Sequence, residues 1–115
     1  MNLNNTQFNI LFNKILYIIE EYLDKISSKT DIDWEINYQI MTISFSKHNK
    51  IIISKQESLK QIWLASKNQG YHFNYIKPNW ICKRTNQNLW NILTKEFFIQ
   101  GKEKVNFSQN INHTN

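Results

Sequence analysis

Six carboxylates gathered in one short segment are the residues of this sequence that could bind a metal ion. They are Glu20, Glu21, Asp24, Asp31, Asp33 and Glu35, which make up six of the nine acidic residues in the chain. Only Lys25 and Lys29 oppose them within residues 20–35, so this segment carries a charge of −4 in a chain whose net charge is +5. Carboxylate oxygens bind hard cations such as Fe(II), Mn²⁺, Mg²⁺ and Ca²⁺, and the residue types alone do not select one of these metals.

The spacing of these carboxylates predicts an open surface. Glu20 and Asp24 are four residues apart on an expected helix, and Asp31, Asp33 and Glu35 alternate on an expected strand, where they share one face at intervals of about 7 Å. Side chains at this spacing can share a cation but cannot wrap it, so we expect weak binding at several shallow sites. The alternative is a solvated acidic face without a ligand. Repulsion and the helix macrodipole both disfavour acids at a helix C-terminus, and their presence there favours the functional interpretation.

A tryptophan on the expected outer face of the sheet is the second candidate. Ile62 and Leu64 share one face of a predicted strand, so burying them leaves Trp63 beside Gln61 on the other face. An exposed tryptophan among amides is typical of a protein-docking surface. The alternative is an indole that packs on a neighbouring outward side chain and meets no partner.

Residue patterns typical of enzymes are absent from the sequence. It contains no GxSxG, GxGxxG, GxxxxGKS/T or HExxH motif, and its three histidines are far apart. We expect His48 and His113 on the surface and His72 on the solvent face of a strand. Cys82 has no charged partner nearby in the sequence and is expected to be a buried strand residue. The chain is therefore not expected to be an enzyme.

Hydrophobic periodicity predicts two helices. Apolar residues recur every three or four positions over about residues 6–26, and again after Thr85 up to Gly101. Asn5 or Thr6 is expected to cap the first helix. Thr85 is expected to cap the second, and Gly101 to follow its last turn.

Residues 31–84 alternate with a period of two, which predicts an antiparallel sheet of five or six strands. Each helix and the sheet have one apolar face, and all three faces are buried only if both helices lie on the same side of the sheet. The predicted fold is an α+β two-layer sandwich with the order α-β(5-6)-α. We expect a single domain over residues 1–101 and a polar, frayed tail over residues 102–115.

Length and composition exclude several classes of protein. The chain has 115 residues, enough for one domain, and its single cysteine allows neither an internal disulfide nor a zinc cluster. No apolar run approaches the about 20 residues of a membrane span, and no secretory signal is visible, so we expect a cytoplasmic protein without membrane contact. A basic nucleic-acid-binding module remains an alternative, disfavoured because Arg84 is the only arginine and the strongest local field is negative.

Several motifs occur in an order found in one protein family. They are Ile19–Asp24, Asp31–Asn37, Lys50–Ile53, Gln56-Glu57, Gln61–Ser66, Gly70–Phe73 and Trp80–Cys82. The chain resembles the bacterial frataxin (CyaY) family over about residues 5–100. The fold of that family agrees with the sandwich predicted above.

The resemblance implies a role in iron–sulfur cluster assembly. It implies that the six carboxylates, here called the acidic ridge, bind Fe(II) and Fe(III) weakly and reversibly. It also implies docking on the cysteine desulfurase and the iron–sulfur scaffold complex, as an iron donor or an iron-dependent regulator. By position, Gln56, Gln61 and Trp63 match the partner-binding surface of the family. The expected state is a monomer without iron and, with iron, an oligomer.

Departures from the family pattern lie close to these residues. Lys25, Ser27 and Lys29 stand where relatives usually carry further acids, which is expected to weaken iron binding and lower its stoichiometry. Ser54 stands where the family commonly has asparagine, at one of the surface contacts. A ferroxidase is a further alternative, but the sequence has no closed di-iron set such as paired ExxH motifs.

Overall fold

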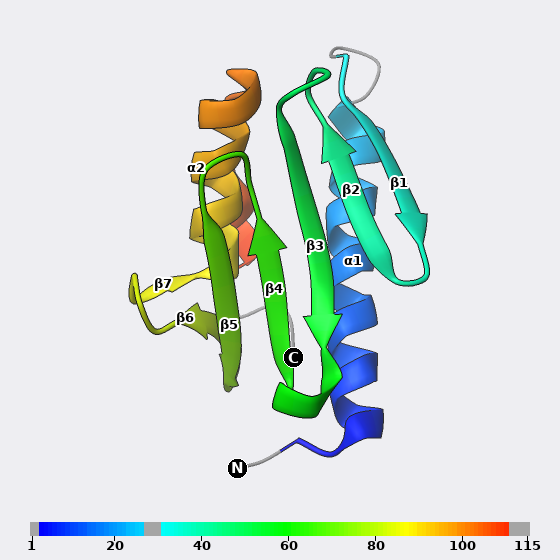
Figure 1. Cartoon of the computed structure of the whole chain (residues 1–115), viewed down its shortest axis with the longest axis vertical. Coiled ribbons are helices and arrows are strands. Elements are labelled where there is room, and N and C mark those ends of the chain that lie inside the picture. Colours follow the sequence, from blue (N-terminus) through cyan, green and yellow to red (C-terminus); the bar gives the residue numbers. More distant parts are fainter. Residues whose placement is uncertain (1–2, 27–30, 111–115) are drawn as a thin grey trace.

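The computed structural model describes residues 3–26 and 31–110, which form two helices and a seven-stranded antiparallel sheet (Figure 1). Helix α1 spans Asn5–Ile26 and helix α2 spans Leu89–Gly101. The strands lie in sequence order across the sheet: β1 (Asp33–Asn37), β2 (Ile40–Ser44), β3 (Lys50–Gln56), β4 (Gln61–Ala65), β5 (Gly70–Ile76), β6 (Asn79–Cys82) and β7 (Gln87–Asn88). The predicted α+β sandwich is confirmed, with the short β7 added to the five or six strands expected. Neither helix in the described part of the chain is both long and apolar enough to cross a bilayer.

Both helices cover the same face of the sheet. In Figure 1, α1 lies behind β1 to β3, and α2 lies behind the half of the sheet that contains β5. Buried and more exposed residues alternate along β2 to β5, because only one face meets the helices. The core between the layers includes Phe8, Phe12, Ile15, Ile19, Leu23, Met41, Ile43, Ile51, Ile53, Ile62, Leu64, Phe73, Leu93 and Phe97. No helix of the described residues covers the opposite face, here called the outer face.

The N-terminal cap of α1 lies one residue before the expected position. The Asn4 side chain accepts a hydrogen bond from the Gln7 backbone N–H at 2.8 Å, and the Gln7 side chain accepts one from the Asn4 N–H at 3.0 Å. This reciprocal pair satisfies two backbone donors at the start of the helix. The expectation of a cap at Asn5 or Thr6 is wrong because both residues already lie inside the helix.

The turn between β1 and β2 uses residues that are unusual for its geometry. Tyr38 and Gln39 have φ values of 53° and 63°. Two successive positive φ values match the twist of a tight hairpin, but they favour glycine or asparagine. Lys60, Asn86 and Lys102 also have positive φ, whereas no glycine of the described residues does.

Both ends of α2 differ from the predicted caps. Its N-cap is Asn88, which accepts a 2.9 Å hydrogen bond from the first turn, because β7 occupies the residues directly after the Thr85 turn. At the other end, Gly101 is the last helical residue and Lys102 takes the left-handed conformation. Glycine is needed at position 101 for close packing, since a Cβ atom there would lie 2.3 Å from the Phe45 ring.

The segment after α2 packs against the domain through Val105 and Phe107, so the expectation of a frayed tail is wrong for these residues. The domain bounds of residues 1–101 stay a prediction. Phe107 is fully buried, and its ring centroid lies 5.0 Å from that of Phe97 in α2. The short 3₁₀ helix η3 (Phe107–Asn110) begins at this residue. The polar composition of residues 102–115 gave no sign in the sequence that Phe107 anchors the segment to the core. Residues 111–115, with His113, lie outside the described residues.

We expect Phe107→Ala to lower the free energy of unfolding by about 3–5 kcal/mol, because it removes a fully buried ring. Chemical denaturation followed by circular dichroism measures the change. The control Gln109→Ala alters an exposed side chain of the same segment and should stay within about 0.5 kcal/mol of the wild type. Equal effects of the two substitutions would contradict the role of Phe107 as an anchor.

Candidate metal-binding and partner-binding surface

The acidic ridge lies on the C-terminal half of α1, on the edge strand β1 and, at Asp31, just before that strand. The Trp34 indole points from β1 toward the helix, and its Nε1 donates to Glu20 Oε2 at 3.4 Å. Trp34 is opposite Ile43, which is buried beneath the helices. Asp33 and Glu35, at the alternate positions of β1, therefore point to the outer face. The carboxylates of α1 therefore lie on the helix-covered side of the sheet, and the carboxylates of β1 point to the outer face.

The ridge carboxylates are accessible and do not converge. Five of the six are exposed, and Glu20, which contacts Trp34, is half-buried. Within the described residues, no three His, Cys, Asp or Glu side chains are placed to hold a metal ion together. The arrangement is an open surface that offers a cation one or two carboxylates and water. Metal binding there remains a prediction.

Two lysines, one in the β2–β3 connection and one at the start of β3, face the strand end of the ridge. Asp31 and Asp33 line a hollow of about 310 Å³ together with Lys47 and Lys50. Asp33 is opposite Ser44, which in turn is opposite Lys50, so the three form one row across the sheet. No local sequence pattern reveals these lysines, because strand pairing, not chain proximity, brings them to the ridge. They reduce the negative potential at Asp31 and Asp33.

Lys25 is the one described residue among the three departures near the ridge. It is exposed in the last turn of α1, where a positive charge complements the negative end of the helix dipole. Ser27 and Lys29 lie outside the described residues. The weakening of iron binding expected from these departures remains a prediction.

Trp63 lies on the outer face of the central strand, as its strand parity predicted. Its indole is half-buried and stacks on the His72 ring, with a centroid distance of 4.2 Å and 10° between the planes. Its Nε1 donates to Gln61 Oε1 at 2.8 Å. The indole therefore packs on an outward neighbour, as the alternative interpretation held, while part of it stays accessible. This stacking could not be predicted from the sequence, because only the β4–β5 register places His72 opposite Trp63.

Amide side chains form a row beside Trp63. Gln56, Gln61 and Asn74 are opposite one another across β3, β4 and β5, and Gln61 Nε2 donates to Asn74 Oδ1 at 3.2 Å. The three residues matched to the partner-binding surface thus share the outer face. Strands β1 and β4 are three strand spacings apart, about 14 Å. One partner can therefore span the strand carboxylates and Trp63.

Cys82 and His48 have the surroundings that the sequence predicted. Cys82 is buried in β6, and His48 is exposed between β2 and β3. Burial opposes ionisation of the thiol, but hydrogen bonds from Thr85 and from the backbone of Arg84 and His72 outweigh it and lower the pKa of Cys82. The thiol is only 2% exposed, which denies a substrate access to it.

A buried carboxylate on α2 escaped the sequence analysis. Glu96 is 2% exposed and accepts hydrogen bonds from the Tyr71 hydroxyl at 2.9 Å and from Gln100 Nε2 at 3.3 Å. Burial and the contact with Glu96 raise the pKa of Tyr71 to about 12. The group joins α2 to β5 inside the core. Its position on the apolar stripe, directly before Phe97, was the signal available in the sequence.

Comparison by sequence finds related proteins over most of the chain. Residues 1–103 match the family model of the frataxin-like domain. The chain is 45% identical over 105 residues to the iron-sulfur cluster assembly protein CyaY of Buchnera aphidicola subsp. Baizongia pistaciae, covering 91% of this chain and 89% of that protein. It is also 45% identical over 103 residues to the CyaY protein of Buchnera aphidicola subsp. Acyrthosiphon pisum, covering 90% and 89%.

Comparison by structure finds the same fold in two solved proteins. The frataxin from Psychromonas ingrahamii superposes with a TM-score of 0.83 at 32% identity, covering 91% of this chain and 98% of that one. The trimeric frataxin from the yeast Saccharomyces cerevisiae, complexed with ferrous iron, has a TM-score of 0.70 at 27% identity, covering 81% and 87%.

We expect Glu21→Gln to lower the pKa of Tyr17 toward its usual value. A hydrogen bond to Glu21, together with the negative charge of that carboxylate, favours the neutral phenol and so raises the pKa of Tyr17. NMR of the tyrosine ring between about pH 8 and pH 12 follows the titration. The matched control Glu20→Gln removes the neighbouring carboxylate, which contacts Trp34 instead, and should leave Tyr17 unchanged. Equal shifts in both variants would contradict a specific Glu21 contact.

Proposed function

Because the chain belongs to the frataxin-like family, we propose that it is an iron-binding protein of iron–sulfur cluster assembly. Fe(II) and Fe(III) are its cargo and bind weakly and reversibly on the acidic ridge. The protein docks on a cysteine desulfurase and its scaffold complex, where it acts as an iron donor or an iron-dependent regulator. It catalyses no covalent step of its own.

The observation that carries this proposal is the accessibility of the ridge. Five of its six carboxylates are exposed, on two elements that lie side by side. Oxygen ligands on an open surface let an ion exchange with water, which cargo must do. The yeast relative complexed with ferrous iron supports Fe(II) as the cargo. That relative is a trimer, and a monomer that oligomerises on iron is part of the proposal for this chain.

The ridge does not bind uniformly in this proposal. Lys47 and Lys50 line one hollow together with Asp31 and Asp33. A positive charge beside a carboxylate disfavours a cation there. We therefore expect Asp31 and Asp33 to bind a cation more weakly than they would without these two lysines.

Two alternatives have less support. A ferroxidase needs a closed set of ligands, and the described residues bring no three potential ligands together. A nucleic-acid-binding surface would bring phosphates against Asp33 and Glu35, which point to the outer face. These observations favour iron binding and a protein partner.

Docking in this proposal combines two kinds of contact. The exposed ridge attracts a basic partner, and this attraction is screened beyond about 8 to 10 Å at physiological salt. Trp63 is held by His72 and Gln61, so it offers a partner an indole of fixed orientation. A desolvated tryptophan of this kind is typical of a binding hot spot.

We expect Fe(II) under anaerobic conditions, and Mn²⁺ as a redox-stable probe, to perturb the backbone amides of residues 18–36 first. The outer face around Trp63 should stay unchanged, because the carboxylates gather at the other site. Two-dimensional ¹⁵N NMR measures both. Perturbations centred on His48, His72 or Cys82 would contradict the assignment to the ridge.

A matched pair of variants separates ridge binding from net charge. Glu21→Gln with Asp33→Asn should weaken metal binding about fivefold or more, since one lost charge contact is worth about 1 kcal/mol in water. Glu57→Gln with Glu103→Gln removes the same charge away from the ridge and should bind nearly as the wild type does. If metal binding weakened equally in both double variants, it would depend on the net charge of the protein and not on the acidic ridge.

We expect the ridge and Trp63 to control different steps of docking on a cysteine desulfurase. Neutralising Glu20, Glu21 and Asp24 together should slow association and flatten its salt dependence, because exposed charges act at long range. Trp63→Ala should speed dissociation, costing about 2 kcal/mol. Surface-binding kinetics at two salt concentrations measure both rates.

The control for the tryptophan is Ile99→Ala, which shortens an exposed side chain on α2, away from the outer face of the sheet. It should leave both rates unchanged. If a folded Trp63→Ala protein dissociates as slowly as the wild type, Trp63 is not part of the interface.

A further inference from the structure

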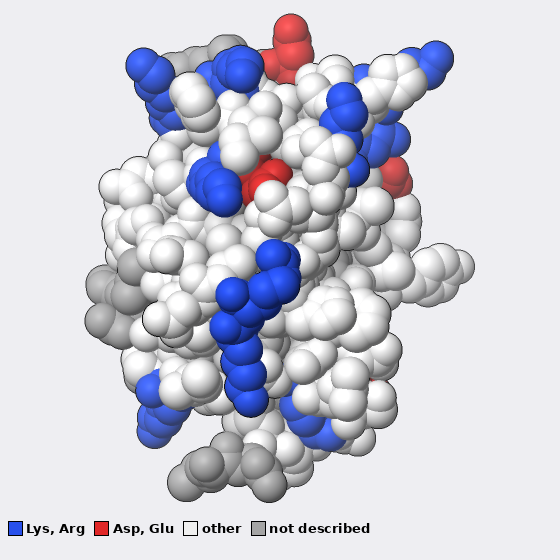
Figure 2. Space-filling view, turned by 60° about the vertical axis from the view of Figure 1, so that its left-hand side comes forward, with Lys and Arg blue, Asp and Glu red and all other residues white. Residues whose placement is uncertain are grey.

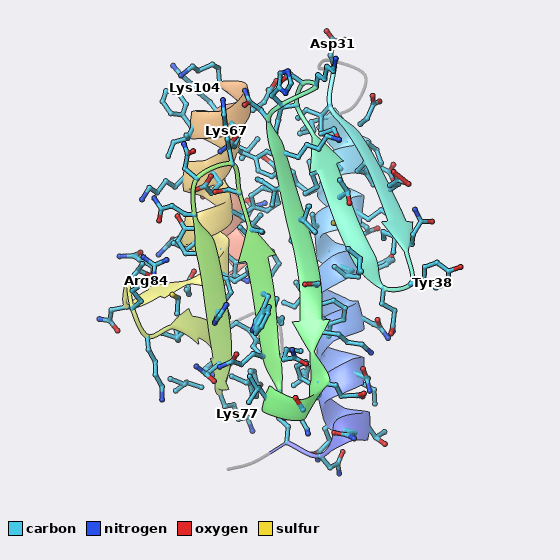
Figure 3. The ribbon with its side chains drawn as sticks, viewed as in Figure 1. Asp31, Tyr38, Lys67, Lys77, Arg84 and Lys104 are labelled. Atoms are coloured by element: carbon cyan, nitrogen blue, oxygen red, sulfur yellow. The ribbon has the colours of Figure 1, made fainter. Side chains whose placement is uncertain are left out.

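The edge of the sheet opposite the acidic ridge is basic. Lys83 and Arg84 directly follow β6. Figure 3 shows Arg84 projecting at this edge, across the sheet from Asp31 and Tyr38 at the β1 edge. Figure 2, which turns this side forward, shows Lys and Arg side chains in a vertical column at the centre of the view, with others scattered above and below it. The outer face thus runs from acidic at β1, through Trp63, to basic at β6.

The outer face is hollowed at its basic edge. The hollow has a volume of about 420 Å³, and its lining includes Gln61, His72 and Asn74 from β4 and β5, with Lys83 and Arg84 after β6. No Asp or Glu is among the residues that line it. Cationic and amide donors without a competing carboxylate form a surface suited to an anion.

Arg84 is held in place at the rim of this hollow. Its Nη2 donates to the Gly70 carbonyl at 2.7 Å, and its guanidinium carbon lies 5.3 Å from the centroid of the Tyr71 ring. Tyr71 is fixed in turn by its hydrogen bond to Glu96 in the core. A guanidinium has five N–H donors, so an Arg84 already ordered by these contacts loses little entropy when its other donors bind a ligand.

We propose that this hollow binds the carboxylates of an acidic protein segment, with Arg84 as the anchor and Lys83 as the second cation. A peptide fits better than an isolated anion for two reasons. The hollow adjoins the stacked rings of Trp63 and His72, which offer apolar contact. Its amides, Gln61 among them, can also pair with a peptide backbone. A partner that covers the whole outer face then presents a basic region to β1 and an acidic segment to β6. This inference goes beyond iron binding and does not require it.

The test is an NMR titration of the metal-free, ¹⁵N-labelled protein with hexaglutamate. We expect saturable shifts confined to residues 61–63, 70–74 and 81–88, and none with hexaglutamine. Lys83→Gln with Arg84→Gln should weaken hexaglutamate binding at least tenfold. The control pair, Lys77→Gln with Lys104→Gln, removes the same charge at positions that do not line the hollow and should change binding less than twofold.

Equal weakening by both pairs, or shifts centred elsewhere, would overturn the proposal. Inorganic phosphate that binds as tightly as hexaglutamate would also overturn it, in favour of a phosphate ligand. If the Arg84 variant fails to fold, Lys83→Glu tests the same site, and unchanged hexaglutamate binding in that variant would refute it. This test is independent of iron binding, because the hexaglutamate titration contains no metal, whereas iron binding is measured by the metal-induced shifts of residues 18–36.

Discussion

Burial of one face of the sheet beneath both helices is the constraint on which the rest of this structure depends. Successive strand residues point to opposite faces, so each strand gives half of its side chains to the core. In β4, Ile62 and Leu64 are fully or almost fully buried, while Gln61 and Trp63 remain on the outer face. Because the core needs nothing from the outer face, that face can carry amides, aromatic rings and charges without loss of packing.

The charged edges also protect the sheet. An edge strand exposes unpaired backbone groups that invite pairing with another chain, and charged side chains make such pairing unfavourable. Asp33 and Glu35 occupy this position on β1, so the acids proposed to bind iron serve a structural purpose as well. At the other edge, β7 is only two residues long and offers little backbone to pair with. The same carboxylates can therefore serve both to bind metal and to protect the edge strand from pairing, and the sequence alone does not separate these two roles.

Local patterns in the sequence predicted the helices and strands. Most of the features that they could not predict are contacts between strands, which depend on long-range pairing. The apolar stripe gave α1 within one residue at its start, and strand parity placed Trp63 on the outer face. Neighbours across strands depend on register, which no local pattern contains. The approach of Lys50 to Asp33 and the stacking of His72 on Trp63 were missed for that reason. Phe107 was missed because a single aromatic residue in a polar segment has no periodicity to reveal it.

The residues at the chain reversals bear on how this molecule folds. Tyr38 and Gln39 turn the β1–β2 hairpin with positive φ, and Lys60 and Lys102 also have positive φ, although such side chains disfavour the left-handed region by about 1–2 kcal/mol each. These turns therefore have little tendency to form in the unfolded chain, and a hairpin closed by Tyr38 and Gln39 is a poor nucleus. We therefore expect this hairpin to form late in folding, after contacts elsewhere in the domain have brought β1 and β2 against α1.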